Sequence, residues 1–83
     1  MSENKQAARY IEGHEVEGLK AQIARTGVTA TELFTKYSAT KPKGLTVNTI
    51  RSWLHTPEKK RTNPKFISWV LNSYKALPAK SLI

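Results

Sequence analysis

The segment from Leu45 to Pro57 (LTVNTIRSWLHTP) constrains the fold most, because it has a marked beginning, a marked end and one apolar face. The hydroxyl of Thr46 can accept a hydrogen bond from an unpaired amide of a first helical turn, and Pro57 limits the helix at its other end. At about 100° of rotation per residue, one face of this helix carries the apolar side chains Ile50, Trp53 and Leu54. The sequence therefore predicts a helix over 46–56 that packs against the rest of the chain through this face.

Two helices are predicted before this segment. The first spans about 14–26 and ends at Gly27, which can adopt the left-handed conformation that closes a helix. Its apolar stripe consists of Val16, Leu19, Ile23 and Ala24. The second spans about 30–37, because Thr29 and Glu32 have the spacing of a capping box.

A fourth helix is predicted over 64–77. Asn63 is a favourable N-cap and Pro64 is suited to the first helical position, so the pair marks a helix start. The apolar stripe behind it contains Phe66, Ile67, Val70, Leu71, Tyr74 and Leu77. Trp69 falls outside this stripe and is expected to be partly exposed.

These patterns predict an all-α fold, a small domain of four to five helices with a long turn over 38–45 between the second and third helices. The helical domain is expected over 14–77. Residues 1–13 show no convincing stripe and are expected to form an N-terminal arm, more loose than ordered, or a short helix. Residues 78–83 form a C-terminal tail, and no segment shows the alternation expected of a strand.

The net charge of +8 is unevenly distributed along the chain. Residues 1–19 contain two basic and four acidic side chains, a net charge of −2, whereas residues 20–83 contain twelve basic and two acidic side chains, a net charge of +10. A surface of this kind attracts polyanions by releasing their condensed counterions. Ribosomal proteins and membrane-surface helices are basic too, so charge alone does not identify the partner.

Several classes of protein are not favoured. The absence of cysteine excludes disulfides and thiolate zinc sites, and two distant histidines have no ligand spacing, so neither a metal nor another cofactor is expected. The chain has no glycine-rich phosphate loop, CxxC or HExxH motif, so we do not expect an enzyme. Without an apolar run of membrane-spanning length or a secretory leader, a soluble cytoplasmic protein is expected, without membrane or small-molecule partners.

Two capped helices, a third of the form TVNTIRSWL, a basic turn and a long apolar closing helix resemble the lambda-repressor and Cro-like helix-turn-helix family, over about residues 16–77. The resemblance implies that the helix beginning at Thr46 enters the major groove of double-stranded DNA, as in a small bacterial or phage transcriptional regulator of the repressor type. The family usually has a turn of three or four residues where this chain has SATKPKGL, and a small residue where it has Phe34.

The resemblance also implies which residues contact DNA. The expected base-contacting residues are Val47, Asn48, Thr49 and Arg51. The resemblance implies backbone contacts for Thr46, Ser52 and His55. The hydroxyl residues of the second helix and the basic loops add further expected backbone contacts, namely Thr29, Thr31, Lys41, Lys43, Lys59, Lys60 and Arg61, although the run of Lys59, Lys60 and Arg61 could also simply be solvated.

Two alternatives stay open. The chain could bind RNA or single-stranded nucleic acid, although such proteins usually present several aromatic side chains on an open platform. It could also be a helical adaptor that binds a protein partner through Trp69. A homodimer would use a candidate surface of Trp69, Leu82 and Ile83, unless the tail or the N-terminal residues cover Trp69 within one chain.

Overall fold

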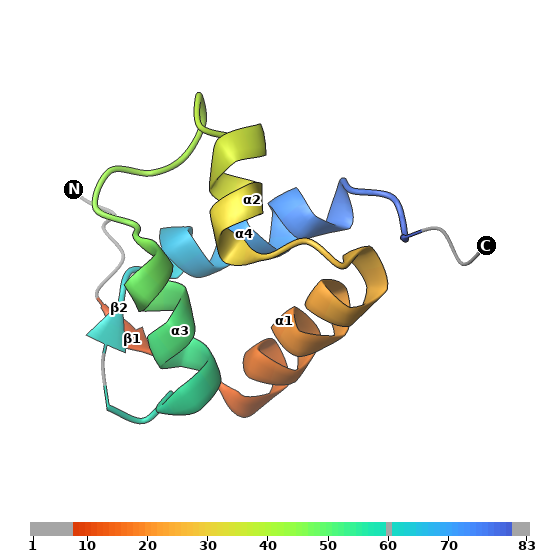
Figure 1. Ribbon diagram of the computed structural model, residues 1–83. Helices are drawn as coiled ribbons and strands as arrows, with labels where there is room; N and C mark the ends of the chain where they lie inside the picture. Colours follow the sequence, from red (N-terminus) through yellow and green to blue (C-terminus); the bar gives the residue numbers. More distant parts are fainter. Residues whose placement is uncertain (1–7, 60, 81–83) are drawn as a thin grey trace.

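Four helices and two short strands follow one another in the described part of the computed structural model, residues 8–59 and 61–80 (Figure 1). In chain order they are β1 (Arg9–Tyr10), α1 (Gly13–Thr26), α2 (Ala30–Lys36), α3 (Val47–His55), β2 (Arg61–Thr62) and α4 (Pro64–Lys75). Each helix begins and ends within two residues of the range predicted from its caps and apolar stripe. The predicted small helical domain is therefore confirmed, with a two-stranded sheet in addition.

The predicted N-caps have the expected hydrogen bonds. The Thr46 hydroxyl accepts from the Thr49 amide at 3.2 Å, and the Asn63 side chain accepts from the Lys65 amide at 2.9 Å. In the capping box of α2, the Glu32 amide donates to the hydroxyl of Thr29 at 3.2 Å, and the Thr29 amide donates to the Glu32 carboxylate at 2.9 Å. These local bonds satisfy amides that a helix leaves without partners, so each helix starts where its cap lies.

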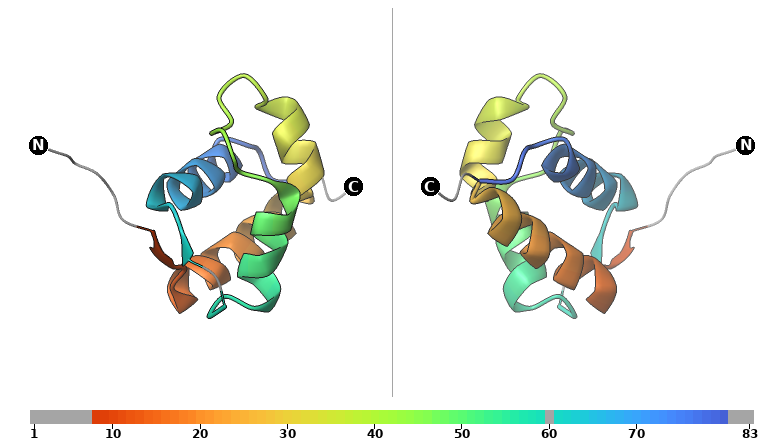
Figure 2. Two further views of the ribbon diagram at one scale, coloured as in Figure 1. Left: turned by 90° about the vertical axis from the view of Figure 1, so that its left-hand side faces the viewer. Right: turned by 90° about the vertical axis from the view of Figure 1, so that its right-hand side faces the viewer.

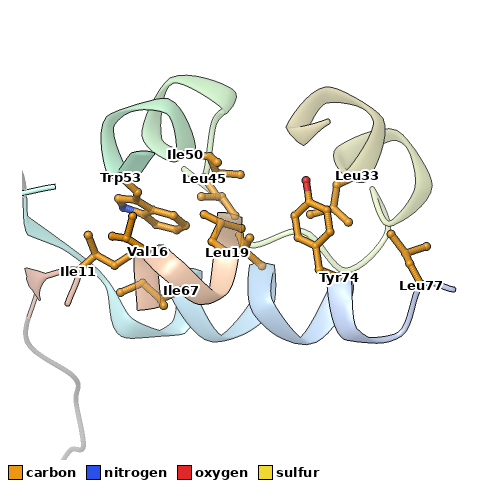
Figure 3. Packing of buried hydrophobic residues seen from close by; sticks show 11 residues of the cluster. Ile11, Val16, Leu19, Leu33, Leu45, Ile50, Trp53, Ile67, Tyr74 and Leu77 are labelled. Carbon is orange, nitrogen blue, oxygen red and sulfur yellow. The ribbon is translucent and has the colours of Figure 1, made fainter. Parts of the chain in front are cut away.

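The core lies between α1, α3 and α4, and α2, which packs against α3, adds the fully buried Leu33 (Figures 1 and 2). Figure 3 shows Trp53 of α3 at one end of the buried cluster and Tyr74 of α4 towards the other. Both side chains are buried, with exposed fractions of 2% and 0%. Leu45 and Ile50 lie next to one another in Figure 3, as expected for a hydrophobic staple across the first turn of α3. The inner face of α3 is thus held along its length.

The prediction of a loose N-terminal arm without strands is wrong for residues 9–11. β1 pairs antiparallel with β2, with Tyr10 opposite Arg61, and Ile11 is buried beside Trp53 (Figure 3). The Arg9 guanidinium donates to both carboxylate oxygens of Glu15 at 2.9 and 2.8 Å, and this pairing holds the pKa of Glu15 below its ordinary value. A strand of two residues is too short to show alternation, so its sequence carries no strand signal.

The connection from α2 to α3, residues 37–46, forms an arch outside the helices (Figure 2). Its tip is fixed by Trp69 of α4, whose indole N–H donates to the hydroxyl of Thr40 at 3.2 Å. The Lys41 ammonium donates to the carbonyl of Leu45 at 2.9 Å and lies 5.3 Å from the centre of the Phe34 ring. The arch is therefore tied to α2 through Phe34 and to α4 through Trp69.

Tyr74 gives the fold a testable dependence on pH. Its hydroxyl donates to the carbonyl of Val28 at 2.7 Å, and burial, with a smaller effect of the Glu32 charge, raises the pKa of Tyr74 from 10.0 to about 12. Above pH 10 the unfolded chain loses this proton while the folded chain keeps it, so deprotonation favours unfolding. The free energy of unfolding should fall by up to about 3 kcal/mol between pH 10 and 12 because of this group.

Denaturant titrations of the wild type and of Tyr74→Phe over pH 8 to 12 measure this dependence. At pH 8 the variant should be less stable by about 1 kcal/mol, since the half-buried Val28 carbonyl loses its donor. As the pH rises above 10, the difference should shrink and then reverse, because only the wild type loses stability through this group. Parallel curves for the two proteins would show that Tyr74 is not responsible.

Candidate nucleic-acid interface

The outward face of α3 carries exposed polar side chains. Asn48, Arg51 and His55 are exposed, whereas Ile50 and Trp53 on the opposite face are buried. This agrees with the predicted facing of the helix. Because the inner face packs in the core, the outer side chains extend from a backbone that is already ordered.

The two hydroxyl residues on the flank of α3, Thr49 and Ser52, are less exposed than Asn48 and Arg51. Thr49 is half-buried, and its hydroxyl lies 3.1 Å from the hydroxyl of Thr46, which also caps the helix. Ser52 is half-buried as well. The structure therefore places Asn48 and Arg51 more openly than the other two predicted base-contacting residues, Val47 and Thr49.

Val47 lies on the other flank of α3, in the wall of a groove. This groove of about 280 Å³ is bounded by the end of α1, the first turn of α2 and α3. It is lined by Ile23, Thr29, Ala30, Thr31, Val47, Ile50, Arg51 and Leu54. The structure thus brings four predicted contact residues together, Thr29, Thr31, Val47 and Arg51.

A second hollow of about 430 Å³ continues along the same side of α3. It is lined by Lys20, Ile23, Ala24, Leu54 and His55. Ala24 was expected on the buried stripe of α1 but is exposed here, and Leu54, expected in the core, is only half-buried. The buried stripe of α1 is therefore narrower than predicted, with Val16 and Leu19 buried and Ile23 half-buried.

The basic loops contribute unequally to this interface. Lys43, Lys59 and Arg61 are exposed, and Lys60 lies outside the described residues. Lys41 is half-buried, and its ammonium donates to the carbonyl of Leu45 within its own loop. Lys41 was predicted to contact the DNA backbone, but its ammonium is already bonded within the arch.

The four arginines of the chain divide into two pairs. Arg9 is bonded to Glu15, and Arg25 donates to the side chain of Gln22 at 2.9 Å and to the carbonyl of Tyr74 at 2.8 Å. Within the described part of the chain, the guanidinium groups of Arg51 and Arg61 have no hydrogen bond or ion pair. The sequence alone does not show which arginines are bonded within the chain. One partner of Arg25, the carbonyl of Tyr74, lies on a different helix and is distant in sequence.

Trp69, the candidate partner surface, packs within its own chain. The indole is half-buried, its ring centre lies 5.9 Å from that of Phe34, and its N–H donates to Thr40. Neither the tail nor the N-terminal residues provide these contacts. Leu82 and Ile83 lie outside the described residues.

The described residues contain no group of three or more His, Asp or Glu side chains that could hold a metal ion. No helix in this part of the chain is long and apolar enough to cross a membrane. Comparison of the chain with protein-family models, with curated proteins and with solved structures finds no match. Function must therefore be inferred from the geometry of the site.

Proposed function

We propose that this protein binds double-stranded DNA sequence-specifically, with α3 in the major groove. The observation that carries the proposal is the outward face of α3, where Asn48, Arg51 and His55 are exposed on a helix whose opposite face is buried. An amide pairs with adenine and a guanidinium with guanine through two hydrogen bonds each, which gives base discrimination. A helix of this kind fits the width of the major groove.

The surroundings of α3 support the same proposal. The first turn of α2, with Thr29 and Thr31, borders the same groove as Arg51. Exposed cations lie on both connections that flank α3, Lys43 before it and Lys59 after it. Hydroxyl groups and cations on either side of a recognition helix are suited to the phosphates that border a major groove.

We further propose that the protein is a small regulator of transcription of the repressor type. A domain with a recognition helix and a basic surface can block the access of other proteins to DNA simply by occupying its binding site. This role needs no catalytic group and no cofactor. The helix-turn-helix assignment belongs to the same proposal, in a form where the arch of residues 37–46 replaces the short turn.

The lysines of the flanking connections should contribute affinity without sequence preference. We expect Lys43→Gln and Lys59→Gln each to weaken selected and random duplexes by similar factors, and to lower the slope of log affinity against log salt by about 0.9. Equilibrium binding at several salt concentrations measures both quantities. Lys75→Gln is the matched control, because Lys75 is exposed at the far end of α4 and should have no such effect.

Selection of bound duplexes from a random pool tests the function directly. We expect enrichment of a defined sequence, and binding to it that survives competition by random duplex. Recovery of unrelated sequences with equal affinity, all released by salt, would contradict the proposal. Preference for single-stranded DNA or RNA in the same competition would favour the alternative of a single-strand binder.

The same selection tests association. A palindromic consensus would indicate that two copies bind with two-fold symmetry, because half-site symmetry mirrors protein symmetry. Binding of a partner protein by Trp69 is not favoured, since its indole already packs against Phe34 and donates to Thr40. Reading of DNA by α3 does not depend on where a dimer surface lies.

A further inference from the structure

Tyr10 stands apart from the other large apolar side chains of the described residues, because it is the one that is exposed, with an exposed fraction of 47%. It lies on β1, directly opposite Arg61 on β2. The Arg61 guanidinium lies over the ring, with its central carbon 5.7 Å from the ring centre. This is the geometry of a cation–π pair.

The pair leaves the hydrogen-bonding edges of Arg61 free. The Tyr10 ring is the one contact of this kind that Arg61 makes among the described residues, which offer the guanidinium no hydrogen bond and no carboxylate partner. By contrast, the neighbouring Arg9 on β1 is bonded to both oxygens of Glu15. A guanidinium that is restrained by an aromatic ring and has no carboxylate partner keeps its N–H donors available for the two-point binding of a phosphate.

The sheet that carries this pair is attached to α3 in two ways. Residues 56–60 join the end of α3 to β2. Ile11, which follows β1 directly, is buried beside Trp53 of α3 (Figure 3). The position of Arg61 relative to the outward face of α3 is therefore defined by the core.

We propose that the β1–β2 sheet is a second phosphate-binding element beside α3, in which Arg61 binds a backbone phosphate of duplex DNA and Tyr10 positions Arg61. This inference rests on the proposed function. It assigns a role to Tyr10 and to the sheet that helix patterns did not indicate. Tyr10 acts through Arg61 and needs no contact with DNA itself.

Four variants test the inference, namely Arg61→Gln, Tyr10→Ala, Tyr10→Phe and the double variant Tyr10→Ala/Arg61→Gln. Arg61→Gln should weaken duplex binding by about five- to tenfold at 0.1 M salt and lower the salt slope by about 0.9. Tyr10→Ala should weaken binding about two- to fivefold, and Tyr10→Phe should bind like the wild type, because the ring is retained. In the double variant, Tyr10→Ala should add nothing to the loss caused by Arg61→Gln.

The measurements are dissociation constants for a selected duplex at several salt concentrations, with the free energy of unfolding of each variant. Tyr10 and Arg61 are exposed, so the variants should fold normally. An equal effect of Tyr10→Ala with and without Arg61 would overturn the positioning role. A larger effect of Tyr10→Ala on single strands than on duplex would indicate stacking on a base and would also overturn it.

The two proposals can fail separately. If Asn48→Ala loses the selected duplex while Arg61→Gln binds it normally, the phosphate-binding sheet is wrong and the reading role of α3 stands. If no variant of α3 distinguishes selected from random duplex, the proposed function itself is wrong, and this inference is lost with it.

Discussion

Replacing Trp53 with alanine is expected to lower the free energy of unfolding by about 3 to 5 kcal/mol, the usual cost of truncating a large buried aromatic side chain. Trp53 is only 2% exposed and lies beside Ile11 and Val16 in the core (Figure 3). Small domains have a total stability of about 5 to 15 kcal/mol, so this loss is a large part of what holds the fold together. The proposed DNA binding should fall with the folded fraction, although Trp53 is buried and does not belong to the outward face of α3.

Trp69→Ala is the matched control for this prediction. The same atoms are removed, but Trp69 is half-buried on the outside of α4, so the loss should be clearly smaller. Urea titrations followed by circular dichroism measure both variants without relying on tryptophan fluorescence. If the two variants lost the same stability, α3 would not be anchored through Trp53 as the structure shows.

The second large effect is expected on base reading. Asn48→Ala and Arg51→Ala should each weaken binding to the selected duplex by about 1 to 3 kcal/mol, or about 5- to 150-fold, and affect random duplex much less. Both side chains are exposed and make no hydrogen bond within the described residues, so stability should barely change. Binding titrations with selected and random duplexes, together with thermal melts, measure these effects.

Asn72→Ala is the control for Asn48→Ala, because Asn72 is an exposed asparagine on α4. It should bind selected duplex like the wild type. Equal losses on selected and random duplexes for the Asn48 and Arg51 variants would mean that these residues contact phosphates rather than bases. If Asn72→Ala had an effect as large as that of Asn48→Ala, the assignment of base contacts to α3 would be wrong, and α4 would be the candidate instead.

The helices could be predicted from the sequence because their signals are local. The caps at Thr29, Thr46 and Asn63 act on amides within three residues, and each apolar stripe has the period of a helix. The period also predicts that Trp53 faces inwards and that Asn48 faces outwards. Both features are set by residues that are close together in the chain. Caps act on nearby amides, and the helical period determines which side chains share the apolar face.

Other features of the interface depend on residues far apart in the chain. β1 pairs with β2 across about fifty residues of sequence, and no alternation marks either strand. Local sequence likewise does not show that Lys41 is held by its own loop, that Arg25 is bonded to α4, or that Trp69 is held by Thr40. Which basic side chains are free to bind a phosphate is decided by the partners that the tertiary fold brings to each of them.

The sequence by itself therefore determined the helices and the outward face of α3, because caps and periodicity act over a few residues. The tertiary structure alone decided the sheet, the anchoring of the arch and the pairing of Arg61 with Tyr10. These contacts form only after distant segments meet, and their geometry depends on how the whole core packs.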